Sequence, residues 1–537
     1  LHTAYRRQRQ MCIRDSTRSA LILRLSTSRC QQGLYTFSKC VSKMTYSSLR
    51  EIAKADFKPA KPFSDSDLNP HALVAKYAVR GRIPTMAEQL KGTLQSDPDA
   101  LPFDKIISAN IGNPQQLDQK PITFYRQVLA LIEYPDLLQN ELATKIFPHD
   151  VIDRATKIMS NLSSVGAYSH SKGVKYFRDT VADYIEDRDG FPADSEDIYL
   201  TAGASAAVNY LLSLLSTGPE TGFLIPIPQY PLYTASLALN NATVLPYYLK
   251  ESDNWSVSAN DMEKIIQDAK AEGVSPRCIV LINPGNPTGA VLTEETIGEI
   301  LNVAAEHGLV VIADEVYQEN VYAGEFISVK RVLRKLQELD AEKYKNVQLA
   351  SLHSTSKGMI GECGQRGGYM EVVGFEESVI AQILKLASIS LCPPVVGQAL
   401  VSLMVNPPHE SHPSHGVFHS EKFGIYKALK ERSHKLYTAF NKMEGVSCQE
   451  PQGAMYCFPS LPLSDKAIAA AEEAGMAPDE FYCAKLLENT GICTVPGSGF
   501  GQVPGTWHLR TTFLAPGTKW IDDWASFHQK FMDKYRV

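Results

Sequence analysis

A lysine set among small hydroxyl residues and followed by an arginine is the part of this chain best suited to chemistry. Ser354, Ser356 and Lys357 form one short run, and Arg366 follows downstream. A lysine amine condenses with an aldehyde when its neutral form is accessible, and hydroxyl and guanidinium groups bind phosphate. Together these groups favour a Schiff-base lysine for pyridoxal 5′-phosphate. Taken alone, the Ser-Thr-Ser-Lys run is more typical of a surface lysine in a serine-rich loop.

A carboxylate that follows a short apolar run could serve the ring of this cofactor. Residues 310–313 are apolar, and Asp314 comes directly after them. A buried parallel strand has this composition, and open α/β sheets bind ligands at the carboxyl ends of their strands. An acid there can keep a pyridine nitrogen protonated, which makes the ring an electron sink. Taken singly, a helix cap or a turn is the simpler interpretation of Asp314.

The segment before this strand predicts a rigid loop and a helix. Residues 283–289 contain two prolines and two glycines, which force an irregular turn after a short strand. A helix is predicted over 293–307, with a threonine cap at its start and a glycine just past its end. In a strand-helix-strand unit, Asn286 and Asp314 would lie at the same edge of the sheet. Asn286 and Tyr317 are therefore candidates to bind the 3′ oxygen of the cofactor ring.

Two further positions upstream could contact the cofactor. Ala204 and Ser205 lie between a predicted strand and a predicted helix, where small residues let backbone N–H groups approach a phosphate. The pattern is neither GxGxxG nor a Walker loop, so nucleotide binding is not indicated. Tyr230 follows the next predicted strand and could stack on the cofactor ring, although an ordinary aromatic at a helix start is an equally good interpretation.

Jointly, these motifs resemble the fold type I pyridoxal-phosphate-dependent aminotransferases of class I and II. The resemblance runs from about residue 102 to 515 and includes Asn286-Pro287-Thr288-Gly289, Asp314 with Tyr317, Ser354 with Lys357 and Arg366, and Arg510. It implies an α/β fold, with a mostly parallel central sheet in a large domain and a smaller α+β domain.

Longer strings resemble the eukaryotic alanine aminotransferase family within this class. They are residues 110–114, 167–173, 282–289, 353–369 and 508–514, together with an insertion between 404 and 427. The implied reaction converts L-alanine and 2-oxoglutarate to pyruvate and L-glutamate, by a ping-pong mechanism through a Lys357 aldimine and pyridoxamine phosphate. A glutamate:glyoxylate or other broad-specificity aminotransferase is the alternative, and a pyridoxal-phosphate lyase matches these strings less well. A catalytically inert protein of this fold would be expected to lack Lys357, Asp314 or Arg510.

The resemblance also implies a role for each site residue. Lys357 would be the catalytic base, Asp314 would hold the ring nitrogen, and Tyr317 would tune the imine. The cofactor-binding set would be Ala204, Ser205, Tyr230, Asn286, Ser354, Ser356, Arg366 and Tyr168, and the substrate-binding set would be Gly112, Asn286 and Arg510. Tyr168 would reach the phosphate of the neighbouring subunit, so a homodimer with shared active sites is expected. The aspartate-specific members have a second arginine that binds the side-chain carboxylate of a dicarboxylic substrate. We identify no such arginine in this sequence.

The composition of the 537-residue chain restricts the classes of function. A hydrophobic content of 44% supports a sizeable core, and a net charge of −6 gives no reason to expect nucleic acid or a membrane as a partner. No apolar run reaches the roughly 18 residues that a transmembrane helix needs. The ten cysteines form no CxxC pair, so reduced thiols are expected.

A segment rich in proline and histidine, residues 407–422, is predicted to be an inserted loop. It contains His409, His412, His415 and His419 without a neighbouring cysteine or a helical pattern. An exposed loop is favoured over a metal site, and no metal is expected. Residues 45–149 are predicted to form an N-terminal arm and the first part of the small domain. Residues 150–406 should form the large cofactor domain and residues 423–537 the small C-terminal domain.

The first 44 residues have the composition of a mitochondrial transit peptide. They hold seven arginines and a single acidic residue, Asp15, and are rich in serine and threonine. The chain begins with Leu1, and residues 6–16 also resemble non-native sequence, so Met11 and Met44 are alternative starts. A start at Met44 would remove the targeting signal. The sequence therefore leaves two locations open, the cytoplasm and the mitochondrion.

Overall fold

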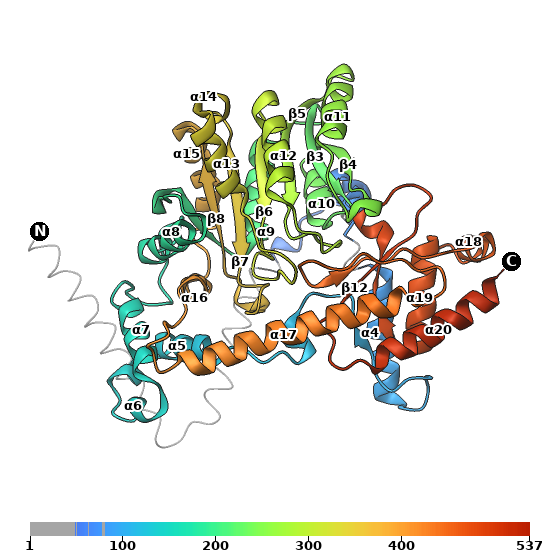
Figure 1. Cartoon of the computed structure of the whole chain (residues 1–537), viewed down its shortest axis with the longest axis horizontal. Coiled ribbons are helices and arrows are strands. Elements are labelled where there is room, and N and C mark those ends of the chain that lie inside the picture. Colours follow the sequence, from blue (N-terminus) through green and yellow to red (C-terminus); the bar gives the residue numbers. More distant parts are fainter. Residues whose placement is uncertain (1–48, 50, 59, 63, 78–80, 537) are drawn as a thin grey trace, which may run out of the picture. The chain divides into compact units, whose positions relative to one another are not determined.

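The computed structural model describes residues 49, 51–58, 60–62, 64–77 and 81–536 (Figure 1). The chain divides into two units, residues 1–68 and 69–537. In the first unit, Ser64 caps the short turn η1 (Asp65–Asp67), and its backbone N–H and hydroxyl both donate to the Asp67 carboxylate at 2.9 Å. The predicted leader, residues 1–44, lies outside the described residues. Every element discussed below belongs to the second unit.

A seven-stranded sheet forms the centre of the second unit (Figure 1). The strand order is β2-β8-β7-β6-β5-β3-β4, and neighbouring strands are parallel except for β8, which runs antiparallel to β2 and β7. The strands are β2 (Ile198–Thr201), β3 (Thr221–Ile227), β4 (Thr243–Tyr248), β5 (Ser275–Ile282), β6 (Val310–Asp314), β7 (Leu349–Ser354) and β8 (Gly368–Val373). All residues of β3, β6, β7 and β8 are buried, as in a sheet covered on both faces. The predicted mostly parallel sheet is confirmed.

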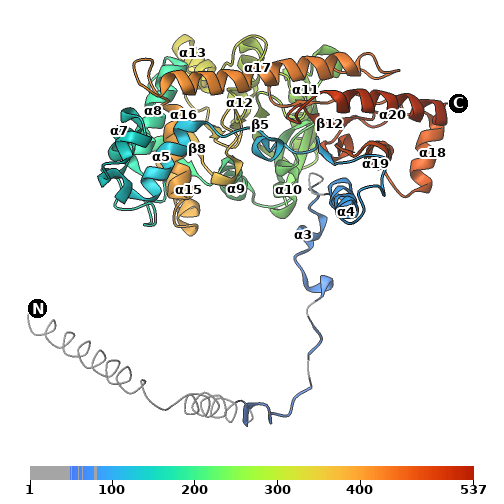
Figure 2. The ribbon, with the colours of Figure 1, turned by 90° about the horizontal axis from the view of Figure 1, so that it is seen from below.

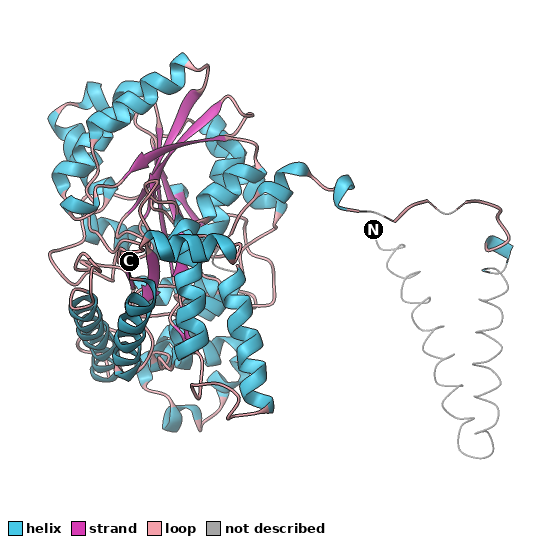
Figure 3. Ribbon diagram, turned by 90° about the vertical axis from the view of Figure 1, so that its right-hand side faces the viewer, coloured by secondary structure: helices cyan, strands magenta, loops and turns pink. Residues whose placement is uncertain are grey.

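Helices cover both faces of this sheet (Figure 3). On one face lie α11 (Ala259–Ala271), α12 (Glu294–His307) and α13 (Val329–Leu339), with the short α14 (Ala341–Tyr344), and on the other lie α9 (Ala204–Leu215), α10 (Leu232–Leu239) and α15 (Glu377–Ile389). Successive strand side chains point to opposite faces. Ile279 and Leu281 of β5 therefore pack with the first set of helices, and Cys278 and Val280 pack with the second set.

The predicted strand-helix-strand unit around Asp314 is confirmed. Helix α12 begins after Thr293, whose hydroxyl accepts the backbone N–H of Thr296, and it ends at Gly308, which has a φ of 63°. Strands β5 and β6 are parallel neighbours, and Ile282 is paired with Asp314. The loop that follows β5 and the carboxylate that ends β6 therefore lie at the same edge of the sheet.

The C-terminal part of the chain forms a smaller α+β assembly. Its strands β11, β12 and β9 make a three-stranded antiparallel sheet, and β1 pairs in parallel with β10. The strands are β1 (Ile107–Ser108), β9 (Tyr456–Cys457), β10 (Ile492–Cys493), β11 (Val495–Pro496) and β12 (Leu509–Thr512), and the helices are α4 (Arg82–Ser96), α18 (Asp465–Glu473), α19 (Pro478–Thr490) and α20 (Lys519–Tyr535). Strand β1 and helix α4 come from the N-terminal part, so the chain passes through this assembly twice.

The helices between residues 123 and 159 differ from the prediction, which placed residues up to 149 in the small domain. Helices α5 (Thr123–Glu133) and α7 (His149–Met159), with the short α6 (Ala143–Ile146) between them, share an apolar core with α8 (Lys175–Asp189) and α16 (Val395–Val405). Phe124, Val128, Leu131 and Ile132 form the buried stripe of α5. Such a stripe shows that one face of a helix is buried, but it does not identify the neighbour that covers the face.

The predicted inserted loop, residues 407–422, is a loop only as far as Ser414. Helix α17 (His415–Phe440) begins within it, contacts α5 near its start and reaches α20 in the smaller assembly (Figures 1 and 2). Prolines dominate the start of the segment and end before His415, so the helix can begin there. No helix within the described ranges is both long enough and apolar enough to cross a membrane.

A buried ion pair joins α13 to strand β8 of the central sheet. The Lys330 ammonium donates to the Glu371 carboxylate on β8, and both side chains are almost completely buried. We expect Lys330→Met to lower the free energy of unfolding by about 3–5 kcal/mol, because the Glu371 charge would stay buried without its partner. Thermal unfolding measures the loss. The double variant Lys330→Met, Glu371→Leu should recover most of it, and no recovery would show that the cost arises from packing.

Candidate active site

One cavity of about 330 Å³ lies where the carboxyl ends of β6 and β7 meet β9 and β12. It brings together all the predicted site residues except Tyr168, namely Gly112, Ala204, Ser205, Tyr230, Asn286, Asp314, Tyr317, Ser354, Ser356, Lys357, Arg366 and Arg510. These residues are separated by hundreds of positions in the sequence. The edge of the parallel sheet collects most of them, because each strand delivers its following loop to the same side.

Asp314 presents a buried carboxylate with one free acceptor atom to this cavity. The Tyr233 hydroxyl, on α10, donates to Asp314 Oδ2 at 2.8 Å. Within the described chain, Oδ1 is buried and has no hydrogen-bond partner. Burial raises the pKa of Asp314 to about 6, against the opposing effect of the Tyr233 hydroxyl. A buried acceptor that lacks a donor suits a protonated ring nitrogen.

The Lys357 amine lies across the cavity from the loop that contains Gly112. Lys357 follows the end of β7 by three residues, and its Nζ donates to the Gly112 carbonyl at 3.0 Å. The same Nζ lies 5.8 Å from the centroid of the Tyr317 ring. The amine is thus held at the cavity by a neutral acceptor, and no carboxylate of the described residues is bonded to it, which leaves it available for imine chemistry.

Arg366 and the start of α9 form an anion-binding cradle. The Arg366 guanidinium donates to the carbonyls of Cys363 at 2.9 Å and Ala202 at 3.0 Å, and its backbone has a φ of 55°, which is uncommon for a residue other than glycine. Gly203 has no side chain where a Cβ would overlap this guanidinium. The guanidinium therefore lies directly beside the first N–H groups of α9, an arrangement that suits a phosphate.

Arg510 is held rigidly at the opposite side of the cavity. Its guanidinium donates to Asn286 Oδ1 at 3.1 Å and to the Asn110 carbonyl at 2.6 Å, while its Nε is buried with no partner among the described residues. Two rings lie against it, since Arg510 Cζ is 4.3 Å from the Tyr456 centroid and 4.6 Å from the Phe500 centroid. Its remaining N–H groups are positioned to bind a carboxylate.

Several residues that line the cavity or support it are not recognisable from the sequence. Tyr233 supports Asp314, Tyr456 touches Tyr317 and Arg510, and the Tyr77 hydroxyl is hydrogen-bonded to that of Tyr230 at 2.6 Å. Cys363 and Tyr77 also line the cavity. A phosphate motif or a strand-end acid can be recognised from its neighbours in sequence. These tyrosines have no such local signal, because only the fold brings them to the site.

Tyr168, which was predicted to bind cofactor, lies outside this cavity. It precedes α8 in a loop, and 79% of its surface is exposed. An aromatic side chain that is this exposed makes no contribution to the site of its own subunit. In the single chain, the Tyr168 side chain is therefore accessible to another molecule.

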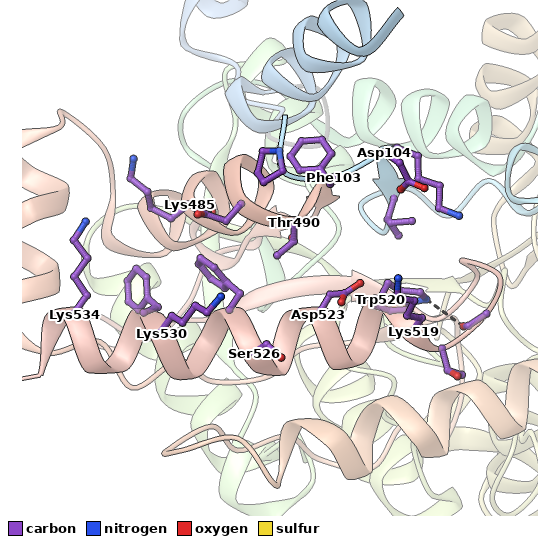
Figure 4. A pocket seen from close by; sticks show the side chains of 18 of the residues that line it. Phe103, Asp104, Lys485, Thr490, Lys519, Trp520, Asp523, Ser526, Lys530 and Lys534 are labelled. Atoms are coloured by element: carbon purple, nitrogen blue, oxygen red, sulfur yellow. Dashed lines mark hydrogen bonds between the residues drawn. The ribbon is translucent and has the colours of Figure 1, made fainter. Parts of the chain in front are cut away.

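A second and larger pocket has a different character (Figure 4). It has a volume of about 820 Å³ and lies between α19, α20 and residues 102–107. Its lysines are Lys105, Lys485, Lys519, Lys530 and Lys534. Most of them are exposed, and within the described chain none pairs with the Asp104 or Asp523 of the same pocket. The volume of a pocket therefore does not identify the active site. The convergence of a lysine, a buried acid and two guanidinium groups in the smaller cavity identifies it.

The sequence as a whole matches the family described as aminotransferase class I and II, over residues 135–520. The chain belongs to this family. It is 59% identical over 488 residues to the mitochondrial alanine aminotransferase of Saccharomyces cerevisiae, an alignment that covers 90% of this chain and 82% of that relative. A solved structure described as an alanine aminotransferase from Pyrococcus furiosus is 26% identical, with a TM-score of 0.67, and covers 87% of this chain and 100% of that one.

Another relative of similar closeness is named an inactive alanine aminotransferase, also from Saccharomyces cerevisiae. It is 57% identical over 488 residues, covering 90% of this chain and 96% of the relative. Overall identity therefore does not separate an active aminotransferase from an inactive one. The individual groups in the cavity have to make that distinction.

Pyridoxal 5′-phosphate is the cofactor of this aminotransferase family, so the predicted cofactor is confirmed. The residues present fit it on three independent observations: the free acceptor at Asp314 Oδ1, the close approach that Gly203 allows to Arg366, and the Lys357 amine at the cavity. The fold type I architecture is confirmed as well.

The raised pKa of Asp314 predicts how cofactor retention depends on pH. Above about pH 6 Asp314 is a carboxylate that can pair with a ring cation, and below that pH binding must first displace its proton. The ratio of the cofactor dissociation constants of Asp314→Asn and the parent should therefore be largest near pH 7–8. It should shrink by up to roughly tenfold per pH unit below 6.

Equilibrium dialysis of the two proteins against cofactor between pH 5 and 8 measures this ratio. Titration of the cofactor phosphate affects both proteins equally and cancels in it. A ratio that stays constant across the range would show that the Asp314 carboxylate does not pair with the ring.

Proposed function

We propose that this protein is an alanine transaminase, which converts L-alanine and 2-oxoglutarate to pyruvate and L-glutamate. The observation that carries the proposal is the convergence of Lys357, Asp314 and Arg510 in one cavity. The similarity to a relative named mitochondrial alanine aminotransferase supports the choice of alanine. Glyoxylate is the alternative acceptor, and its use is tested by adding it to the protein after the reaction with L-alanine.

Each of these groups has one task in the reaction. When bound, pyridoxal phosphate supplies a carbonyl that condenses with amines and a ring that accepts electrons. Lys357 Nζ is the general base that takes a proton from the substrate Cα. Asp314 holds a proton at the ring nitrogen, and Arg510 orients the substrate through its α-carboxylate. Because Arg510 belongs to the smaller assembly and Lys357 to the large one, closure of the two domains would complete the site.

The distribution of charge in the cavity supports a small amino acid as donor. Among the described lining residues, the cationic side chains are Lys357, Arg366 and Arg510, and each already has a task at the amine, the phosphate or the α-carboxylate. A guanidinium dedicated to a second carboxylate, as in aspartate-specific members, is therefore not part of the described lining. A methyl side chain needs no such partner.

A catalytically silent member of the family is the second candidate. The 57% identity to a relative named inactive favours it. The presence of Lys357, Asp314 and Arg510 in hydrogen-bonded positions argues for activity, since a protein without catalytic function has no need to keep a lysine beside a buried acid.

A half-reaction decides between the two candidates. Purified protein saturated with cofactor is mixed with L-alanine in the absence of any keto acid. We expect pyruvate to form in an amount equal to the cofactor, with loss of its visible absorbance. Lys357→Ala should form at least roughly a thousandfold less in the same time, because the general base is absent.

Two outcomes would contradict the proposal. Loss of absorbance with another amino acid but not with alanine would keep the chemistry and reject alanine as donor. Equal rates in the parent and in Lys357→Ala, or no pyruvate from either, would favour the catalytically silent candidate.

We also propose that the protein works as a homodimer with shared active sites. The support is the exposed position of Tyr168, which does not line the cavity of its own chain. Tyr168→Phe should raise the dissociation constant of the cofactor about tenfold, the effect of one hydrogen bond to a charged group, without changing the mass measured by sedimentation. A monomeric parent protein, or unchanged cofactor affinity in Tyr168→Phe, would contradict the shared site.

For the location in the cell we propose the mitochondrion. The support is the arginine-rich composition of residues 1–44 and the mitochondrial name of the 59% identical relative. We likewise propose that residues 150–406 belong to the large domain and residues 423–537 to the small domain. Residues 82–117 would join the small domain, and residues 123–149 would join the large one.

A further inference from the structure

We propose that Tyr456 is a positioning residue that links the carboxylate-binding Arg510 to the cofactor-facing Tyr317. We further propose that residue 112 is a glycine because the Tyr456 hydroxyl occupies the space of a side chain there. The proposal rests on the proposed transaminase function and deepens it. Neither the motifs nor the family resemblance assigns a role to Tyr456.

The ring of Tyr456 fixes the plane of the Arg510 guanidinium. Arg510 Cζ lies 4.3 Å from the Tyr456 centroid and 4.6 Å from that of Phe500, so the guanidinium is sandwiched between two rings. Strand β9 pairs with β12 so that Tyr456 is opposite Thr512. Arg510 is two residues from Thr512 and therefore projects from the same face of the sheet, diagonal to Tyr456. The two side chains are thus positioned by one short sheet.

The hydroxyl of Tyr456 reaches from this sheet to the large domain. It lies 3.1 Å from the hydroxyl of Tyr317, and the two rings meet edge to face at 5.9 Å. A phenol has one hydrogen to donate. If Tyr317 donates its hydrogen to the cofactor, as its predicted role requires, its oxygen is left to accept the hydrogen of Tyr456. Tyr456 thereby strengthens and orients the donor on Tyr317.

The surroundings of the Tyr456 hydroxyl are cationic. Burial by itself would raise the pKa of Tyr456, but the positive charges of Lys357 and Arg510 and the hydrogen bond shared with Tyr317 lower it from the ordinary value. Tyr317 shows the opposite shift, and burial raises its pKa. The two phenols therefore differ in acidity although they touch, and Tyr456 is the better donor in the pair once Tyr317 is committed elsewhere.

Gly112 provides the space that this arrangement needs. A Cβ at residue 112 would overlap the hydroxyl oxygen of Tyr456 and come within 3.1 Å of Lys357 Nζ. The carbonyl of Gly112 accepts from the same Nζ at 3.0 Å. As a predicted substrate-binding residue, Gly112 would also let the substrate approach the backbone closely. The structure adds a second reason, which is present before any substrate binds.

The first test needs neither substrate nor cofactor. We expect Gly112→Ala to lower the melting temperature of the apoprotein, since the new methyl group meets the Tyr456 hydroxyl. Adding Tyr456→Phe should recover at least half of that loss, although Tyr456→Phe alone gives no gain. Additive effects of the two changes would overturn the steric pairing of the two residues.

The second test follows the visible absorbance of bound cofactor against pH. Tyr456→Phe should move the midpoint of this titration upward by roughly half a pH unit, because weaker donation by Tyr317 to the ring oxygen leaves the titrating proton more tightly held. Tyr317→Phe should move it further in the same direction. Tyr322→Phe is the matched control, since this buried hydroxyl bonds the Ala454 carbonyl at 2.7 Å and does not line the cavity. A midpoint unchanged in Tyr456→Phe but shifted in Tyr317→Phe would overturn the link.

The third test uses 2-methylalanine, which lacks the Cα hydrogen and so binds without turnover. Its dissociation constant should rise about tenfold in Tyr456→Leu, which loses the ring beside Arg510, and stay within twofold of the parent in Tyr456→Phe, which keeps it. Equal affinity in all three proteins would overturn the positioning of Arg510. Because none of these tests requires turnover, they distinguish failure of this proposal from failure of the alanine half-reaction.

Discussion

The site depends on a carboxylate that the fold buries at the end of β6. Burying Asp314 raises its pKa to about 6, and Tyr233 supplies one hydrogen bond while Oδ1 has no partner among the described residues. An acid left in this state is costly to the folded protein unless a cation or donor joins it. A cofactor ring whose nitrogen pairs with Asp314 would supply this missing partner. The neighbouring amine and guanidinium groups, the phosphate-binding residues and the closely packed glycine surround the space for such a ring.

The two halves of the catalytic apparatus come from different sheets. Asp314 and Lys357 follow strands of the central sheet, whereas Tyr456 and Arg510 lie on strands of the small one. Side chains join them at the cavity, through the contacts of Tyr456 with Tyr317 and of Arg510 with Asn286. Such contacts can break and form again as the halves move, which is what binding and release of successive substrates require.

The relative named inactive shows why the individual side chains of the cavity say more about activity than the overall sequence identity does. At 57% it is almost as similar to this chain as the relative named mitochondrial alanine aminotransferase, at 59%. A difference in activity can arise at residues that touch the cofactor or at residues that position them. Positioning residues such as Tyr456 are the ones that a search for catalytic motifs overlooks.

The sequence by itself determined the fold class, the cofactor and most of the cavity. Residues 283–289, the acid after β6, and the lysine with its hydroxyl neighbours were recognisable because each is a local pattern, and parallel strands deliver local patterns to one edge. Tertiary structure alone decided the rest. No sequence pattern around Tyr233 or Tyr456 indicates that they reach the site. The apolar stripe of α5 does not indicate which helices cover it, and α17 begins inside a segment that was predicted to be a loop. The physical reason is that burial depends on which surfaces meet, and the sequence records only that a surface is apolar.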